Sequence, residues 1–190
     1  GLVSTIDIRP QSGNRIHGNE YGIFLKATED NQITNNTVYN NTYDGIHLES
    51  HSNNNIADNN VSGNNNGIAL SSITPNNSND IINNTVVSNT KYGIYLKDGE
   101  NYNTITGNTV MRNERGICLE AASHNTIKGN EIRDNDHGVW LENSGHNTIE
   151  SNMIVNNTGG GTGANVTGES SGNEIHENCF IDNEPQARDD

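Results

Sequence analysis

Hydrophobic residues in this chain alternate with other residues in short segments, and the whole pattern repeats along the sequence. The repeated unit reads Asn-x-(Ile/Val), then Asn-x-hydrophobic, then Asn, and it is joined to Gly-(Ile/Val)-x-Leu, a segment that occurs six times. The leading hydrophobic positions lie 22 to 26 residues apart, at Ile33, Ile56, Ile81, Ile105, Ile127, Ile149 and Ile175. A period in this range is typical of a solenoid.

Each unit predicts three short β-strands separated by bends, because its apolar positions follow a period of two and never a sustained helical spacing. Bends that fall at the same point of every unit indicate a coiled chain. Stacked coils would pair each strand in parallel with its equivalent, about 4.8 Å away. We therefore predict an all-β fold, a right-handed parallel β-helix of about seven to eight three-sided coils, the handedness following from the rule for parallel connections.

Asparagine occupies three positions of every unit, which predicts ladders of stacked side chains. An Asn amide both donates and accepts hydrogen bonds, and Asn tolerates the left-handed backbone of a tight bend. The columns are Asn31, Asn54, Asn79, Asn103, Asn125, Asn147 and Asn173; Asn36, Asn59, Asn84, Asn108, Asn130, Asn152 and Asn178; and Asn41, Asn64, Asn89, Asn113, Asn135, Asn157 and Asn183. This regularity favours a structural role for asparagine over a ligand-binding one.

The low hydrophobic content of 29% suits such a fold, since each coil needs only about four inward side chains. Ile105, Val110, Ile117 and Leu119 would supply them in one coil. We predict a single domain over residues 1–190 and a fragment of a longer chain. Its parts would be a partial first coil at 1–30, regular coils at 31–157, a looser Gly-rich coil at 158–172, and a last coil and tail at 173–190.

A net charge of −14 argues against nucleic acid as a partner, because its phosphates would be repelled. Acidity is compatible with divalent cations, Ca²⁺ among them, or with a neutral or cationic glycan. No apolar run approaches membrane-spanning length, so we expect no membrane-spanning segment. Cys118 and Cys179 fall in different strand columns of distant coils, which argues against a disulfide between them.

The residues that alternate with Ile and Leu in Gly-Ile-x-Leu-x should point outward and form a binding face. The two outward columns are Phe24, His47, Ala69, Tyr95, Cys118 and Trp140, and Lys26, Glu49, Ser71, Lys97, Glu120 and Glu142. Aromatic rings can stack on sugars, and carboxylates can accept hydrogen bonds from hydroxyls. The predicted glycan-binding residues are Tyr95, Trp140, Glu120, Glu142, Arg115 and His137. A solvated face with scattered rings is the alternative.

Catalysis and metal binding are further alternatives. An enzyme would use Glu120, Glu142, Asp134, Asp136 and Arg115, because the two glutamates one coil apart resemble the carboxylate pair of a retaining glycosidase. Glu114, Asp134 and Asp136 are weak candidate metal ligands, and salt-bridged surface groups are the competing interpretation. A copper site would draw on His124, His146, Met153, His176 and Cys179.

The segment from Asn103 to Leu119 resembles the β-helix repeats of the NosD-like family of exported copper-accessory and cell-surface proteins. Its pattern is Asn-Thr-Ile-x-x-Asn-x-Val-x-x-Asn-x-x-Gly-Ile-x-Leu. The resemblance covers about residues 12 to 188. It implies an extracellular or cell-surface location, or alternatively a periplasmic one. Related coils serve polysaccharide lyases, hydrolases, epimerases and adhesins, so the repeat predicts a fold more strongly than an activity.

The leading functional prediction is an extracellular or cell-surface β-helix module that acts as a rigid, carbohydrate-binding element. Its partners would be a polysaccharide or cell-envelope glycan and, through exposed strand edges at its ends, further copies of itself. The first alternative is a polysaccharide-active enzyme, namely a lyase, hydrolase or epimerase. The second is a periplasmic NosD-like copper-accessory protein.

Overall fold

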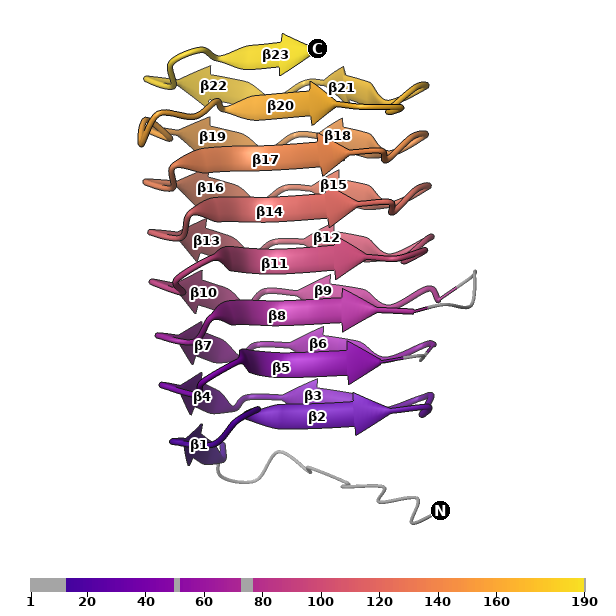
Figure 1. Ribbon diagram of the computed structural model, residues 1–190, viewed down its shortest axis with the longest axis vertical. Helices are drawn as coiled ribbons and strands as arrows, with labels where there is room; N and C mark the ends of the chain where they lie inside the picture. Colours follow the sequence, from indigo (N-terminus) through magenta and orange to yellow (C-terminus); the bar gives the residue numbers. More distant parts are fainter. Residues whose placement is uncertain (1–12, 50–51, 73–76, 190) are drawn as a thin grey trace.

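The repeated unit folds into one turn of a three-sided solenoid, and the turns stack along a single axis (Figure 1). The computed structural model describes residues 13–49, 52–72 and 77–189. In Figure 1 the front strands run to the right, the rear strands run to the left, and the chain climbs from its N-terminal to its C-terminal coil. This is a right-handed parallel β-helix, as the repeat predicts.

Three parallel sheets form the sides of the solenoid. The long-strand sheet contains β2 (Ile23–Lys26), β5 (Asp44–Glu49), β8 (Asn66–Ser71), β11 (Tyr92–Lys97), β14 (Arg115–Glu120), β17 (His137–Glu142), β20 (Ala164–Thr167) and β23 (Ala187–Asp189). The first short-strand sheet contains β1 (Arg15–His17), β4 (Thr37–Tyr39), β7 (Asn60–Ser62), β10 (Thr85–Val87), β13 (Thr109–Met111), β16 (Glu131–Arg133), β19 (Met153–Val155) and β22 (Cys179–Ile181). The second short-strand sheet contains β3 (Gln32–Thr34), β6 (Asn55–Ala57), β9 (Asp80–Ile82), β12 (Thr104–Thr106), β15 (Thr126–Lys128), β18 (Thr148–Glu150) and β21 (Glu174–His176).

The core is a stack of aliphatic layers. Ile105, Val110, Ile117 and Leu119 are all fully buried, which confirms the predicted inward set of that coil. Each inward residue pairs in register with its equivalent in the next coil, as Ile105 does with Ile127. Because a coil buries only these few residues, a chain of low hydrophobic content can still build a continuous core.

Asparagine ladders hold the bends, as predicted. The backbone N–H and the Nδ2 of Asn108 both donate to Asn130 Oδ1 in the next coil, at 2.9 and 3.0 Å, and Nδ2 also donates to the Ile81 carbonyl of the preceding coil. The left-handed backbone, however, lies one residue earlier than expected. Arg112 and Asp134, not the ladder residues Asn113 and Asn135 that follow them, have positive φ. The ladder asparagines are therefore selected for hydrogen bonding.

The glycine before each inward Ile or Val in the long strands is required by close packing. A Cβ atom on Gly116 would lie 2.6 Å from the Gly138 carbonyl oxygen and 2.9 Å from Asn135 Nδ2. Any side chain at this point would push successive coils apart. The glycine column therefore sets how tightly the coils stack beside the asparagine ladder.

The Gly-rich coil stays in register despite its altered sequence. β20 replaces Gly-Ile-x-Leu with Gly-Ala-Asn-Val, yet Val166 pairs with Leu141 of β17. The two cysteines are free, with Cys118 buried and Cys179 exposed, in agreement with the predicted absence of a bridge. Within the described ranges, the structure has no helix of the length and apolarity that a membrane crossing requires.

Candidate functional site

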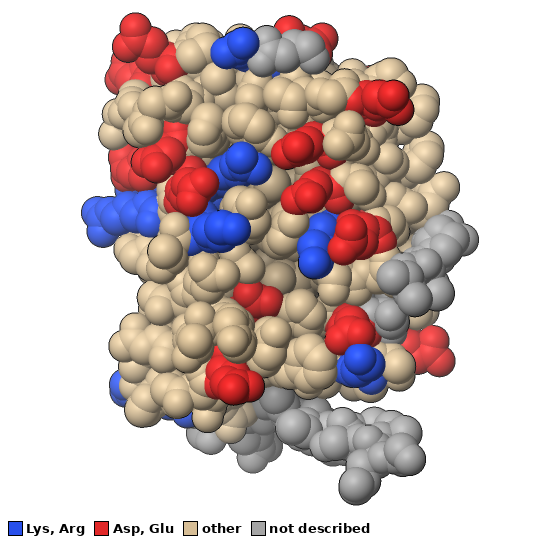
Figure 2. Space-filling view, in the orientation of Figure 1, with Lys and Arg blue, Asp and Glu red and all other residues tan. Residues whose placement is uncertain are grey.

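The outer face of the long-strand sheet carries the predicted binding residues. Tyr95, Cys118 and Trp140 are neighbours in one column, and Lys97, Glu120 and Glu142 are neighbours in the next. Figure 2 shows this face, on which acidic and basic side chains gather over the middle coils. We call the group formed by Tyr92, Tyr95, Arg115, His137 and Trp140 the Trp140 cluster.

Trp140 is fixed by contacts on two sides. The guanidinium carbon of Arg115 lies 4.0 Å from the centre of the Trp140 ring, a cation–π contact. His137 meets the same ring edge-on, with the ring centres 4.7 Å apart, and the Trp140 Nε1–H donates to Glu142 Oε2 at 3.3 Å. Trp140 is half-buried, so the site presents a preformed Arg–Trp unit instead of a freely projecting ring.

Tyr95 and Glu120 form a second fixed pair in the cluster. The Tyr95 hydroxyl donates to Glu120 Oε2 at 2.5 Å, and the Tyr92 and Tyr95 rings lie 4.3 Å apart. Burial, together with the hydrogen bond to Glu120, raises the pKa of the Tyr95 phenol well above its ordinary value. Tyr95 is therefore a neutral hydrogen-bond donor that orients the Glu120 carboxylate.

Cys118 lies beneath the cluster and is not available for chemistry. Although its side chain starts on the outer face, it is fully buried, and Arg115 Nη1 donates to its Sγ at 3.7 Å. Burial raises the pKa of the Cys118 thiol to about 12. A neutral, covered thiol is a poor nucleophile and a poor metal ligand, so Cys118 serves as packing under the rings.

His137 stands at the rim and is held as a neutral imidazole. Its Nδ1 accepts a hydrogen bond from the Thr162 N–H at 3.3 Å, which leaves Nε2 to carry the proton. Burial and the nearby Arg115 lower the pKa of His137. A Cβ atom on Gly161 would overlap His137 Nδ1, so the Gly-rich segment packs directly against this residue.

In the acidic corner beside the cluster, Asp134 is held by its own partners. Arg133 contacts Glu131 Oε1 at 2.7 Å and Asp134 Oδ2 at 2.6 Å, while Asn156 Nδ2 donates to Asp134 Oδ1. The hydrogen bond from Asn156 and the contact with Arg133 lower the pKa of Asp134. The catalytic interpretation of Asp134 and Asp136, and the metal-binding interpretation of Glu114, Asp134 and Asp136, remain predictions.

Three side chains of metal-ligand type converge elsewhere, at the bend after β18 and β21. Ligand atoms of Glu150, His176 and Glu177 lie within 4.8 Å of one another, and this is the one such group in the described part of the chain. Lys128 Nζ already binds Glu150 Oε1 at 2.6 Å.

The group combines one imidazole with two carboxylates, whereas copper prefers imidazole and sulfur ligands. The predicted sulfur ligands Met153 and Cys179 are neighbours in register but do not belong to it. The predicted ligands His124 and His146 stack on each other with ring centres 5.1 Å apart. The copper interpretation remains a prediction.

A second group of rings lies on the same face, and only two of its members, Phe24 and His47, were predicted to point outward. Tyr21, Phe24, Tyr43 and His47 lie together at the N-terminal end of the long-strand sheet, and His47 Nδ1 is 2.6 Å from Asp44 Oδ2. The sequence did contain a signal for this group. Asp44 and His47 are three residues apart in one strand, and Tyr21 lies one coil before Asp44. We call these four rings the N-terminal ring cluster.

The stacked coils, the asparagine ladders and the aromatic side chains on the outer face define the class of protein, a parallel β-helix solenoid with a polar surface. The chain belongs to the NosD family, described as periplasmic copper-binding protein, which matches it over residues 7–124 and 74–190. No curated protein sequence matches the chain.

Several solved structures share the fold. The periplasmic alginate epimerase AlgG is 20% identical with a TM-score of 0.69, over 91% of this chain and 48% of that one. The A-module of the Azotobacter vinelandii mannuronan C-5 epimerase AlgE6 is 18% identical with a TM-score of 0.62, over 93% of this chain and 55% of that one. The chain thus spans about half the length of these enzymes, and identities this low show similarity of fold alone.

Proposed function

We propose that this protein is an exported β-helix module that binds a neutral polysaccharide on the Trp140 cluster. The observation that carries the proposal is the fixed unit of Trp140, Arg115 and His137 beside two outward carboxylates. Rings pack on the apolar faces of sugars, while guanidinium and carboxylate groups hydrogen-bond hydroxyls. Because these side chains already hold one another, binding would cost little side-chain entropy.

The charge of the face favours a neutral ligand over a uronate polymer. Glu120 and Glu142 are adjacent in register, and the whole chain carries a net charge of −14. An anionic polymer would be repelled by this field, whereas the hydroxyls of a neutral sugar can donate to both carboxylates. We therefore assign neutral, linear polysaccharides as the ligand class.

The comparisons support an exported protein that contacts glycans. The family is described as periplasmic, and the AlgG structure is of a periplasmic enzyme that acts on alginate. A location in the cell envelope would place the module beside the polysaccharides of the envelope. The proposal includes either location, the periplasm or the cell surface.

A polysaccharide-active enzyme is the second candidate, favoured by one observation. Glu120 and Glu142 are adjacent carboxylates, each oriented by an aromatic donor, with the neutral imidazole of His137 nearby. Release of shorter or unsaturated products from polysaccharides would identify this activity. The copper-accessory alternative would rest on the stacked pair His124 and His146 and on His176.

Trp140→Ala should weaken binding to a neutral polysaccharide at least tenfold, because it removes the ring that the other side chains surround. Affinity electrophoresis through gels that contain a neutral glucan or mannan would measure the loss. Tyr102→Ala is the matched control, since Tyr102 is an exposed ring on a different corner, next to His124. Equal retention of the Trp140→Ala variant and the parent would refute the proposed site.

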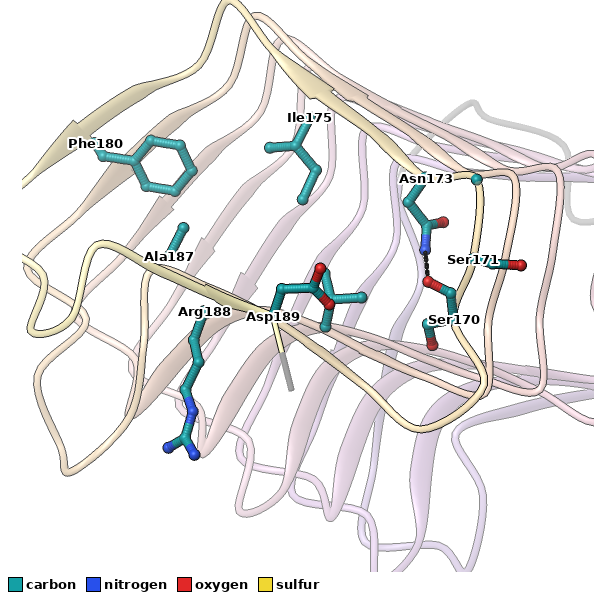
Figure 3. Close-up of a pocket in the computed structure, with 10 residues that line it drawn as sticks. Ser170, Ser171, Asn173, Ile175, Phe180, Ala187, Arg188 and Asp189 are labelled. Carbon is teal, nitrogen blue, oxygen red and sulfur yellow. Dashed lines mark hydrogen bonds between the residues drawn. The ribbon is translucent and has the colours of Figure 1, made fainter.

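The C-terminal coil has a hollow that suits self-association. It has a volume of about 560 Å³ and is lined by Val166, Ile175, Phe180 and Ala187 among others (Figure 3). The Ile175 and Phe180 side chains point into it, and 36% of Ile175 is exposed. For the polypeptide of residues 1–190, we propose that a second copy can cover this hollow, because exposed apolar interiors and free strand edges favour pairing.

Light scattering over a concentration series should therefore detect dimers or larger species of the parent. Ile175→Lys should shift the protein toward monomer, because it places a charge in the apolar hollow. Asn60→Lys, at an exposed position on β7 far from this end, adds the same charge and serves as the control. A parent that stays monomeric at every concentration would rule out association through this end.

A further inference from the structure

The N-terminal ring cluster has the features of a binding surface. Tyr21 lies 5.2 Å from Phe24 and 5.3 Å from Tyr43 between ring centres, and Phe24 stacks on His47 at 5.2 Å. Phe24 and Tyr43 remain 42% and 47% exposed, so two rings offer open faces to the solvent. Large exposed aromatic groups on an otherwise polar solenoid indicate a contact surface.

A buried carboxylate fixes the polar part of this cluster. Asp44 is 6% exposed, its Oδ2 lies 2.6 Å from His47 Nδ1, and its Oδ1 accepts a hydrogen bond from Asn66 Nδ2 at 2.7 Å. A buried charge requires such partners. Because Asp44 Oδ2 occupies His47 Nδ1, the other ring nitrogen of His47 is the one left to hydrogen-bond a ligand.

The two clusters lie in line along the axis of the solenoid. Phe24, His47, Ala69, Tyr95, Cys118 and Trp140 are successive neighbours in register. Five steps of one strand spacing separate Phe24 from Trp140, about 24 Å in total. Between the clusters, β8 contributes Asn66, Ala69 and Ser71 to this side of the sheet, and none of them carries a ring.

We propose that the N-terminal ring cluster is a second subsite for the same polysaccharide, which lies along the solenoid axis and contacts both clusters. This inference rests on the proposed function of the Trp140 cluster. The step between coils is close to the length of one sugar unit in an extended chain, so roughly five or six units would span both subsites. Ligands shorter than this would reach the Trp140 cluster alone. The N-terminal ring cluster would thus make affinity depend on chain length.

The test is the affinity for neutral β-1,4-linked glucose or mannose oligosaccharides of two to eight units, measured by calorimetry. The parent should bind the six-unit oligosaccharide at least tenfold more tightly than the three-unit one. Phe24→Ala should lose this gain and keep the parent affinity for three units, whereas Trp140→Ala should weaken binding at both lengths. Tyr102→Ala should match the parent at both lengths. Thermal unfolding of each variant establishes that the fold is retained.

Three outcomes would overturn the inference. If the affinity of the parent does not depend on length but still depends on Trp140, the second subsite is wrong and the proposed function stands. If Phe24→Ala leaves the length dependence unchanged, the chain does not pass over the N-terminal ring cluster. If no neutral oligosaccharide binds the parent, both the inference and the proposed function fail.

Discussion

Replacing Asn130 with leucine is expected to lower the free energy of unfolding by about 3–5 kcal/mol. Asn130 is 2% exposed, and its Oδ1 accepts hydrogen bonds from the backbone N–H and Nδ2 of Asn108 at 2.9 and 3.0 Å. Its Nδ2 donates to the Ile105 carbonyl at 2.9 Å. Leucine would fill the space but leave the buried Asn108 N–H and Ile105 carbonyl without these partners, and each such loss costs about 1–3 kcal/mol.

Urea and thermal unfolding, followed by circular dichroism, would measure this loss. Asn60→Leu is the matched control, because Asn60 is exposed on β7, one residue after the ladder residue Asn59. Asn101 also lies outside the three ladders, but it is a poorer control because its Oδ1 accepts a hydrogen bond from the Ser123 N–H at 2.7 Å. Similar destabilisation by Asn130→Leu and Asn60→Leu would contradict a stabilising role for the ladder.

The fold could be predicted from the sequence because each coil repeats the same local solution. Ile105, Val110, Ile117 and Leu119 recur at fixed spacing, and a repeat of that kind fixes strand register without knowledge of distant contacts. The residue with left-handed backbone was misplaced by one position, because Asn has both a conformational and a hydrogen-bonding advantage. Only the coordinates separate these two effects.

The candidate site was only partly predictable. Column register places Trp140 beside Cys118 and Glu142 beside Glu120, and both pairings were expected from the repeat. The contact of Arg115 with Trp140 depends on how a long side chain turns along the face, which spacing does not determine. His47 was predicted to point outward, but its contact with Asp44 was missed for the same reason. Side-chain direction, rather than strand register, limits prediction here.

Glu100 carries the largest pH effect that we expect in this protein. It is fully buried at a bend where the following coils have Ala122 and Ser144. Burial raises the pKa of Glu100 to about 8, although a hydrogen bond from Asn103 Nδ2 at 3.3 Å favours the charged form. The ordinary value is 4.5. The folded state therefore holds a proton that the unfolded state releases, and stability is lost as the pH rises from the unfolded pKa through the folded one.

Glu100→Gln should remove this loss because glutamine stays neutral at every pH. Relative to the parent, the variant should gain on the order of 4 kcal/mol between pH about 4.5 and pH about 8.5, as the sign of the shift requires. Thermal and urea unfolding at half-unit pH intervals would measure the difference. Glu114→Gln is the matched control for the same change of side chain, since Glu114 is exposed on a bend of the next coil. If the difference between Glu100→Gln and the parent is flat over this range, Glu100 does not hold its proton in the folded protein.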